Sequence, residues 1–235
     1  MVLFLTIVSG LAWTAVYIDA IRIGFRDRSY AIPAAALGLN FAWETIYAAR
    51  SVATGISTQG VFNIAWALAD VVIVYTFLRF GRSELPGWVT RRLFIGWALL
   101  LGATPFAVQG LFVVEFGWED APRYAAFLQN LLMSGLFIAL FVARQGPRGQ
   151  TMLIAVAKWI GTLAPTIVFG WYGNSPLILG VGVLCSIFDL AYIGLLWRVS
   201  PVPAQSQSRC GSDSGAAAGA SAGSETDVPP SEASS

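Results

Sequence analysis

Three acidic residues and one lysine interrupt stretches that are otherwise apolar. Glu44, Asp70 and Asp189 each fall near the middle of such a stretch, and Lys158 lies at a similar depth in another. A charge at the centre of a membrane costs about 2.5–3.5 kcal/mol or more, so each of these residues is a functional candidate by default. Asp19 is different, because it lies near one end of its stretch, where snorkelling to water or pairing with a neighbouring arginine explains it.

The spacing of these acids places other polar residues beside them. Asn40 and Glu44 are four residues apart, and Asn63, Trp66 and Asp70 follow the pattern i, i+3, i+7, so each set shares one helix face. Both faces are predicted to line an interior cavity. The alternative is that the buried amides only tie helices together by interhelical hydrogen bonds. These amides are Asn40, Asn63, Gln109, Gln129 and Asn130.

Such residues suit acid chemistry on an apolar substrate. A carboxyl group that an apolar, water-poor site keeps neutral can act as a general acid and protonate an alkene or an epoxide. Lys158 is a candidate counter-ion that keeps one acid ionised and leaves another protonated. The faces of deep aromatic rings attract cations, so Trp43 and Trp66 beside buried acids suit carbocation intermediates.

The elements that position these residues are predicted to be membrane helices. The chain has 235 residues, of which 56% are hydrophobic, 11% are charged and none is histidine, whereas soluble domains carry about 25% charged residues. A bilayer core about 30 Å thick needs about 20 mostly apolar residues per helix. Seven segments qualify, so we expect an all-α, polytopic seven-transmembrane-helix bundle. They are residues 3–23, 31–53, 58–79, 93–114, 124–143, 151–171 and 176–197.

The distribution of arginine predicts the orientation of the bundle. The first, third and fifth connections and the end of the last span carry most of the arginines, whereas the opposite side offers only Arg50 and Arg123. The positive-inside rule therefore predicts an outside N-terminus and a cytoplasmic C-terminus in the cell membrane. Residues 1–198 form the predicted transmembrane domain. Residues 199–235 are rich in Ser, Ala, Gly and Pro and are predicted to be a disordered cytoplasmic tail.

Several function classes are excluded by what the sequence lacks. It has no aspartate-rich cluster or Asp-x-Asp-Asp run, as soluble terpene synthases have, and no lysine in the last span for a retinal Schiff base. It has no Pro-Gln pair of the small seven-span sugar transporters. Without histidine, intramembrane zinc or iron is not expected. We expect no cofactor, no metal and no nucleic-acid partner, and the abundance of Ala, Gly and Arg suggests a bacterial source.

One short motif resembles a known family. The run Asn-Phe-Ala-Trp-Glu at 40–44 resembles the second-span motif of the small integral membrane terpene cyclases of fungal meroterpenoid and indole-diterpene pathways. Asp189, within Phe-Asp-Leu-Ala-Tyr at 188–192, resembles the last-span acid of that family. The resemblance extends over about residues 10–198 and takes in Trp66, Asp70 and the run at 158–162.

The resemblance implies a terpene cyclase that acts on a prenyl chain already attached to an aromatic or indole-bearing partner. Bacterial relatives act on farnesylated indole alkaloids of the drimentine type, which contain a diketopiperazine. The two residues implicated in protonation carry over to Glu44 and Asp189. We hypothesise that Glu44, oriented by Asn40, donates the proton, and that Asp189 either assists it or fixes the adjoining network.

The remaining site residues have supporting roles in this hypothesis. Asp70 and Lys158 complete the polar network, and Trp43, Trp66 and Tyr192 are expected to stabilise the travelling cation. The expected reaction is redox-neutral, independent of metal and without loss of diphosphate. The expected partners are the prenylated substrate, the lipid bilayer and an upstream prenyltransferase.

Two other functions use the same residues. Intramembrane Asp, Glu and Lys also serve proton relays, so the main alternative is a proton-coupled transporter of a small lipophilic compound. In a scaffold or assembly factor, the polar residues would only pack helices.

Overall fold

The computed structural model describes residues 1–199, and this part of the chain is helical without strands. It confirms the all-helical prediction. The predicted tail lies outside the described residues except for Val199. The elements are α1 (Val2–Asp27), α2 (Ala34–Thr54), α3 (Thr58–Phe80), the 3-10 segment η1 (Gly81–Glu84), α4 (Arg91–Ala143), α5 (Met152–Pro165), the π-helical segment η2 (Thr166–Tyr172) and α6 (Pro176–Val199).

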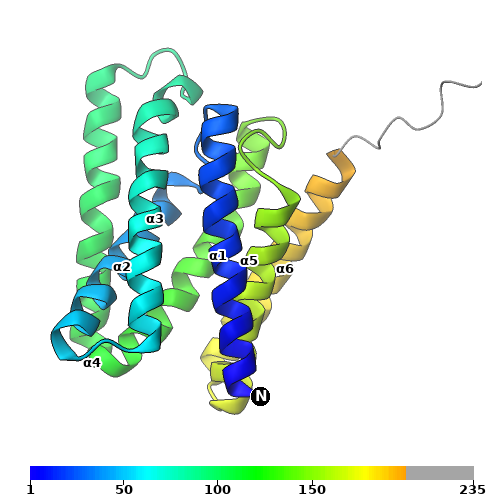
Figure 1. Ribbon diagram of the computed structural model, residues 1–235. Coiled ribbons are helices and arrows are strands. Elements are labelled where there is room, and N and C mark those ends of the chain that lie inside the picture. The colour runs from blue at the N-terminus through cyan, green and yellow to red at the C-terminus, as the bar shows by residue number, and fades with distance from the viewer. Residues whose placement is uncertain (200–235) are drawn as a thin grey trace, which may run out of the picture. The chain divides into compact units, whose positions relative to one another are not determined.

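Helix α4 joins the fourth and fifth predicted spans, so the described residues form six α-helices where the sequence predicted seven. A straight helix of 53 residues would be about 80 Å long at 1.5 Å per residue. Yet Arg144, at its end, bonds to Glu84, which precedes its start, at 2.8 Å. The helix doubles back at Gly117, whose φ of 69° and ψ of 170° are not helical. Glycine tolerates this positive φ because it has no Cβ. Figure 1 shows the two parts of α4 running in opposite directions.

The composition of the helices identifies a membrane protein. Five stretches are long and apolar enough to cross a bilayer: Val2–Asp27, Gln59–Glu84, Arg91–Ala143, Met152–Tyr172 and Pro176–Val199. Helix α2 is not among them and carries Asn40, Glu44 and Arg50 within its 21 residues. Large apolar side chains cover the outside of the bundle, for example Leu99, which is 68% exposed, as suits a surface in contact with lipid.

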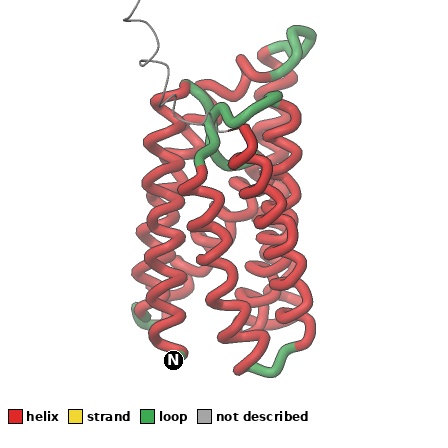
Figure 2. Tube along the Cα trace, turned by 90° about the vertical axis from the view of Figure 1, so that its right-hand side faces the viewer, coloured by secondary structure: helices red, strands yellow, loops and turns green. Residues whose placement is uncertain are grey.

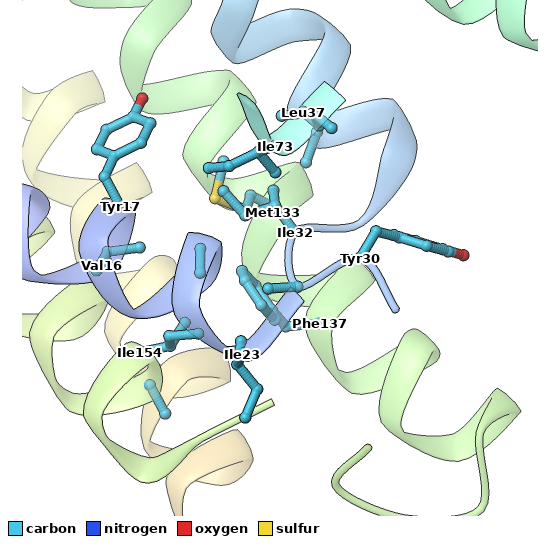
Figure 3. Close-up of a cluster of buried hydrophobic side chains, with 14 of the residues drawn as sticks. Val16, Tyr17, Ile23, Tyr30, Ile32, Leu37, Ile73, Met133, Phe137 and Ile154 are labelled. Carbon is cyan, nitrogen blue, oxygen red and sulfur yellow. The ribbon is translucent and has the colours of Figure 1, made fainter. Parts of the chain in front are cut away.

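The helices pack so that the polar residues face inward. Helix α1 contacts α3 and α5, α2 contacts α3 and α4, and α6 contacts α4 and α5. A hydrophobic cluster fills the centre, and Figure 3 shows part of it, with Val16, Ile73, Met133 and Phe137 among its members. The hydroxyl of Tyr17 points away from these side chains in the same view.

The connections gather at two ends of the bundle, as Figure 2 shows. At one end, which we call the basic end, the connections at residues 28–33, 81–90 and 144–151 meet. There Arg144 binds Glu84 at 2.6 Å and donates to the backbone oxygen of Tyr30 at 2.8 Å. The connection at 55–57, the bend at 117 and the turn at 173–175 lie at the other end, which we call the cavity end. Arg50, for example, lies 4.5 Å from the ring centre of Trp118 there.

Candidate active site

A cavity of about 930 Å³ extends into the bundle from the cavity end. Side chains from α1, α2, α3, α4, α5 and η2 form its wall. Its volume falls within the range of about 300–1,000 Å³ that is usual for small-molecule sites. The cavity is therefore large enough for a small apolar substrate and is built mostly from aromatic and polar side chains.

Glu44 lies in the wall of this cavity. Its side chain is only 3% exposed, and its Oε2 atom has no hydrogen-bond partner. Helical spacing places Asn40 one turn before it and Tyr47 one turn after it, and all three side chains line the cavity. The structure thus places the predicted proton donor against the space that a substrate would fill.

Asn40 forms a hydrogen bond with a second buried acid, Asp70. The Asn40 amide donates to Asp70 Oδ2 at 3.1 Å and also to the hydroxyl of Tyr17, which in turn donates to Asp70 Oδ2 at 3.5 Å. Gln129 donates to Asn40 Oδ1 at 3.4 Å. The side-chain hydrogen bonds of Asn40 therefore go to Asp70, Tyr17 and Gln129 rather than to Glu44. Asp70 itself is fully buried and lies behind the wall.

Asp189 and Lys158 form a separate buried group. Lys158 Nζ donates to both carboxylate oxygens of Asp189, at 2.8 and 3.0 Å, and to Ser134 Oγ at 2.7 Å. The two charged side chains are 1% and 2% exposed, and neither residue belongs to the cavity wall. The ion pair joins α5 to α6, and Ser134 adds the second part of α4. The structure does not bring Asp189 together with Glu44 in the cavity wall.

Of the three aromatic residues predicted to stabilise the cation, two line the cavity and one does not. The Trp43 indole donates to the backbone oxygen of Pro122 at 3.0 Å, and the Trp66 indole donates to Thr14 Oγ1 at 3.2 Å. Both rings line the cavity, held in place by these bonds. Tyr192 is fully buried against Phe137, with ring centres 5.3 Å apart, and lies outside the wall.

Several wall residues were missed by the sequence reasoning. Tyr17 stacks on Trp66 with ring centres 6.0 Å apart and an interplanar angle of 15°. It could have been found, because Gly10, Trp13 and Tyr17 follow the same i, i+3, i+7 pattern and all line the cavity. Trp118 was not predicted as a site residue either, but its side chain contributes to the mouth of the cavity.

Within residues 1–199, no three His, Cys, Asp or Glu side chains are grouped closely enough to hold a metal ion. The expectation that the reaction needs no metal stays a prediction.

Comparison with known proteins identifies the family of the chain. The model of the family described as Pyr4-like transmembrane terpene cyclases matches residues 1–201. The chain is 31% identical over 180 residues to Pyr4-family terpene cyclase mfmH of Annulohypoxylon moriforme, covering 73% of this chain and 72% of that protein. It is 24% identical over 202 residues to terpene cyclase pyr4 of Aspergillus fumigatus, covering 81% and 83%. No solved structure matches the chain. The chain belongs to the family of Pyr4-like transmembrane terpene cyclases and is a membrane-bound terpene cyclase.

Proposed function

We propose that this cyclase starts its reaction by protonating the far end of a prenyl chain attached to an aromatic acceptor, with Glu44 as the proton donor. The observation that carries the proposal is the environment of Glu44. Its carboxyl group lines an aromatic cavity, one of its oxygens has no hydrogen-bond partner, and within residues 1–199 it forms no ion pair.

The contrast with Asp189 supports this assignment. An isolated buried charge is very costly, so a buried carboxyl group without a cation is expected to carry its proton. Lys158 compensates the charge of Asp189 at 2.8 Å. Glu44 has no such partner and is therefore the acid that can give up a proton to a substrate in the cavity.

The proposed reaction conserves all atoms and electrons. Glu44 gives its proton to one carbon of the terminal double bond, or to the oxygen of a terminal epoxide, and a tertiary cation forms. Successive double bonds of the chain attack this cation and close rings, and loss of one proton from carbon ends the reaction. The product of an alkene substrate is therefore an isomer of the substrate. The cavity wall holds the chain folded for these ring closures, which supplies catalysis through orientation.

Trp43, Trp66 and Tyr17 lie where the cation would travel. Their faces present negative charge density, which favours a cation without reacting with it. Asp70 and the Lys158 pair support the site from behind the wall: Asp70 fixes Asn40 and Tyr17, and Asp189 fixes Lys158. We propose that Asp189 acts through this ion pair rather than on the substrate, and that Tyr192 acts through its packing against Phe137.

The proposed substrate is a farnesylated indole that carries a diketopiperazine, supplied by an upstream prenyltransferase. This choice comes from the resemblance to the drimentine-type cyclases and is compatible with the cavity volume. The relatives named above are fungal, so a bacterial source also stays a prediction. Because these relatives are named as cyclases, they favour this function over the proton-coupled transporter.

We further propose that the chain crosses the cell membrane seven times with an outside N-terminus. Each part of α4 before and after Gly117 is long enough for one crossing, and α2 crosses as the second span while keeping its polar face inside the bundle. The arginine-rich connections meet at the basic end, which the positive-inside rule places in the cytoplasm. The cavity would then open toward the outer face.

Membranes that carry the wild-type protein or Glu44→Gln test the proposal. Each is incubated with a farnesylated indole diketopiperazine, and products are identified by mass spectrometry and NMR. After the membranes are solubilised in detergent, so that no proton gradient exists, the wild type should form an isomer of unchanged mass. The rate of this reaction should be at least about 100-fold lower for Glu44→Gln. Glu115→Gln, an exposed residue outside the cavity, is the matched control. Full activity of Glu44→Gln would overturn the proposal.

A further inference from the structure

The outer part of the cavity differs chemically from the part around Glu44. Helix α2 contributes to both, because Glu44, Tyr47, Arg50 and Ser51 follow one another at helical spacing along the wall. The inner part holds an acid among aromatic rings. The outer part holds a guanidinium group and hydroxyl groups around an indole ring, a combination that the cyclisation chemistry itself does not use.

Arg50 has unused hydrogen-bonding capacity at the mouth. Its side chain is 34% exposed, and its guanidinium group lies 4.5 Å from the ring centre of Trp118. Within residues 1–199 its one ion-pair partner is Glu119, which is 3.9 Å away and 92% exposed, and such exposed pairs contribute little. A guanidinium group has five N–H donors. Arg50 therefore keeps donors available for a ligand that enters the cavity.

The other arginine at this end, Arg123, is already engaged. It binds Asp120 at 2.9 Å and donates to the backbone oxygen of Glu119 at 3.3 Å. Arg50 and Arg123 thus place the same positive charge at the mouth of the cavity. They differ in that more of the N–H donors of Arg123 are engaged in hydrogen bonds. This difference makes Arg123 the natural control for Arg50.

Tyr47 links the inner and outer parts of the cavity. Its ring centre lies 5.0 Å from that of Trp43 and 6.3 Å from that of Trp118, in an edge-on arrangement with the latter. The side chain is 7% exposed and lines the cavity, yet its hydroxyl group has no hydrogen-bond partner. A buried hydroxyl without a partner costs about 1–3 kcal/mol, which a bound acceptor oxygen would recover.

From these contacts we propose that Tyr47, Arg50 and Trp118 form the binding site for the acceptor part of the substrate. The ligand class is a flat ring system with carbonyl oxygens, such as an amide or lactam ring. Its rings contact the faces of Trp118 and Tyr47, and its carbonyl oxygens accept hydrogen bonds from Arg50 and the Tyr47 hydroxyl. This inference rests on the proposed function and adds to it the orientation in which the substrate lies in the cavity.

In this orientation the prenyl chain enters first. Six residues separate Glu44 from Arg50, which corresponds to about 9 Å along the axis of α2. A farnesyl chain is longer than this when extended, so a chain anchored at Arg50 reaches Glu44 only when it is folded. The anchor and the acid together therefore favour the folded conformation that ring closure needs.

The test compares two substrates in the wild type and in three variants. One substrate is the farnesylated indole diketopiperazine, and the other is a farnesylated indole that lacks the carbonyl-bearing ring. Arg50→Leu should raise KM for the first substrate about tenfold, as expected for loss of a charge-assisted hydrogen bond. For the second substrate KM should not change. Arg50→Lys, which keeps the charge but not the planar fork, should raise KM for the first substrate by less.

Arg123→Leu should leave the ratio of the two KM values as it is in the wild type. The inference would be overturned if Arg50→Leu raised KM equally for both substrates, or if Arg123→Leu changed the ratio of the two KM values as much as Arg50→Leu does. Either result would leave the proposed function intact. Failure of the wild type to convert either substrate would instead contradict the proposed function, and the inference would fall with it.

Discussion

The buried ion pair between Lys158 and Asp189 offers a quantitative test of how the bundle is held together. Lys158→Met would remove the only cation that contacts Asp189 within the described residues. The carboxylate would then be left in an apolar interior, since its side chain is 2% exposed. Ser134 would not be orphaned, because its hydroxyl also donates to the backbone oxygen of Asn130 at 2.9 Å.

Breaking a buried pair by removing one partner costs about 3–5 kcal/mol, because the remaining charge is uncompensated. For a chain of this size, 1 kcal/mol shifts the melting temperature by about 2–4 °C, so the expected loss is about 6–20 °C. Replacing both partners by apolar residues of similar size, as in Lys158→Met with Asp189→Leu, removes both charges at once. The double variant should therefore recover most of the lost stability.

Thermal unfolding in detergent, followed by tryptophan fluorescence, measures these shifts. Arg26→Met is the control, because its pair with Asp27 is exposed and should contribute no more than about 1 kcal/mol. Asp189 lies outside the cavity wall, so the double variant should also retain cyclisation. A double variant as unstable as Lys158→Met would refute the energetic reasoning. A stable but inactive one would show that Asp189 or Lys158 is needed for the reaction itself.

Three further predictions address the cavity wall, the network behind it and the orientation in the membrane. Trp66→Leu should change the distribution of cyclised and prematurely deprotonated products, measured by mass spectrometry and NMR, because a ring that stabilises the cation is lost; an unchanged distribution would exclude Trp66 from this role. Asn40→Leu should lower stability by about 1–3 kcal/mol in thermal unfolding, because Asp70 loses its amide donor; a shift no larger than that of Arg26→Met would contradict this. In a background without native cysteines, a membrane-impermeant thiol reagent should label Gly55→Cys from outside intact cells and Gly87→Cys only after permeabilisation; the reverse pattern would contradict the proposed orientation.

Much of the fold could be predicted because membrane helices leave a strong signal. The predicted span 58–79 became α3, Thr58–Phe80, and 176–197 became α6, Pro176–Val199. The joining of two predicted spans into α4 could not be predicted in the same way. A single glycine with positive φ turns the chain at Gly117, and hydropathy carries no information about one backbone angle.

The π-helical geometry of η2 after Pro165 was also not predicted. The segment Thr166–Tyr172 falls inside the predicted span 151–171, and its composition is as apolar as that of an α-helix. Hydrophobic periodicity therefore identified the span but did not distinguish one helix type from another.

The site was predictable only where polar residues stand out in apolar helices. Glu44, Asn40 and Asp70 were found in this way, and the helical spacing correctly placed Asn40 and Glu44 on one face. The hydrogen-bond and ion-pair partners of these residues were not predictable from the sequence. Asn40 binds Asp70 and Lys158 binds Asp189 through contacts between different helices, which spacing along one helix does not determine. Tyr47 was missed, since one tyrosine among many aromatic residues of a membrane protein carries little signal of its own. Tyr17 was missed although it follows Gly10 and Trp13 at helical spacing.

In the proposed mechanism Glu44 starts the reaction by protonating carbon, and cyclisation in D2O tests this step most directly. Glu44 lines an open cavity, so its proton should exchange with solvent between turnovers. With an alkene-terminated farnesyl substrate, the wild-type product should gain one mass unit, from one deuterium on the carbon that was protonated, and Glu44→Gln should form no such product. A cyclised wild-type product without deuterium on carbon, or an equally deuterated product from Glu44→Gln, would contradict the account.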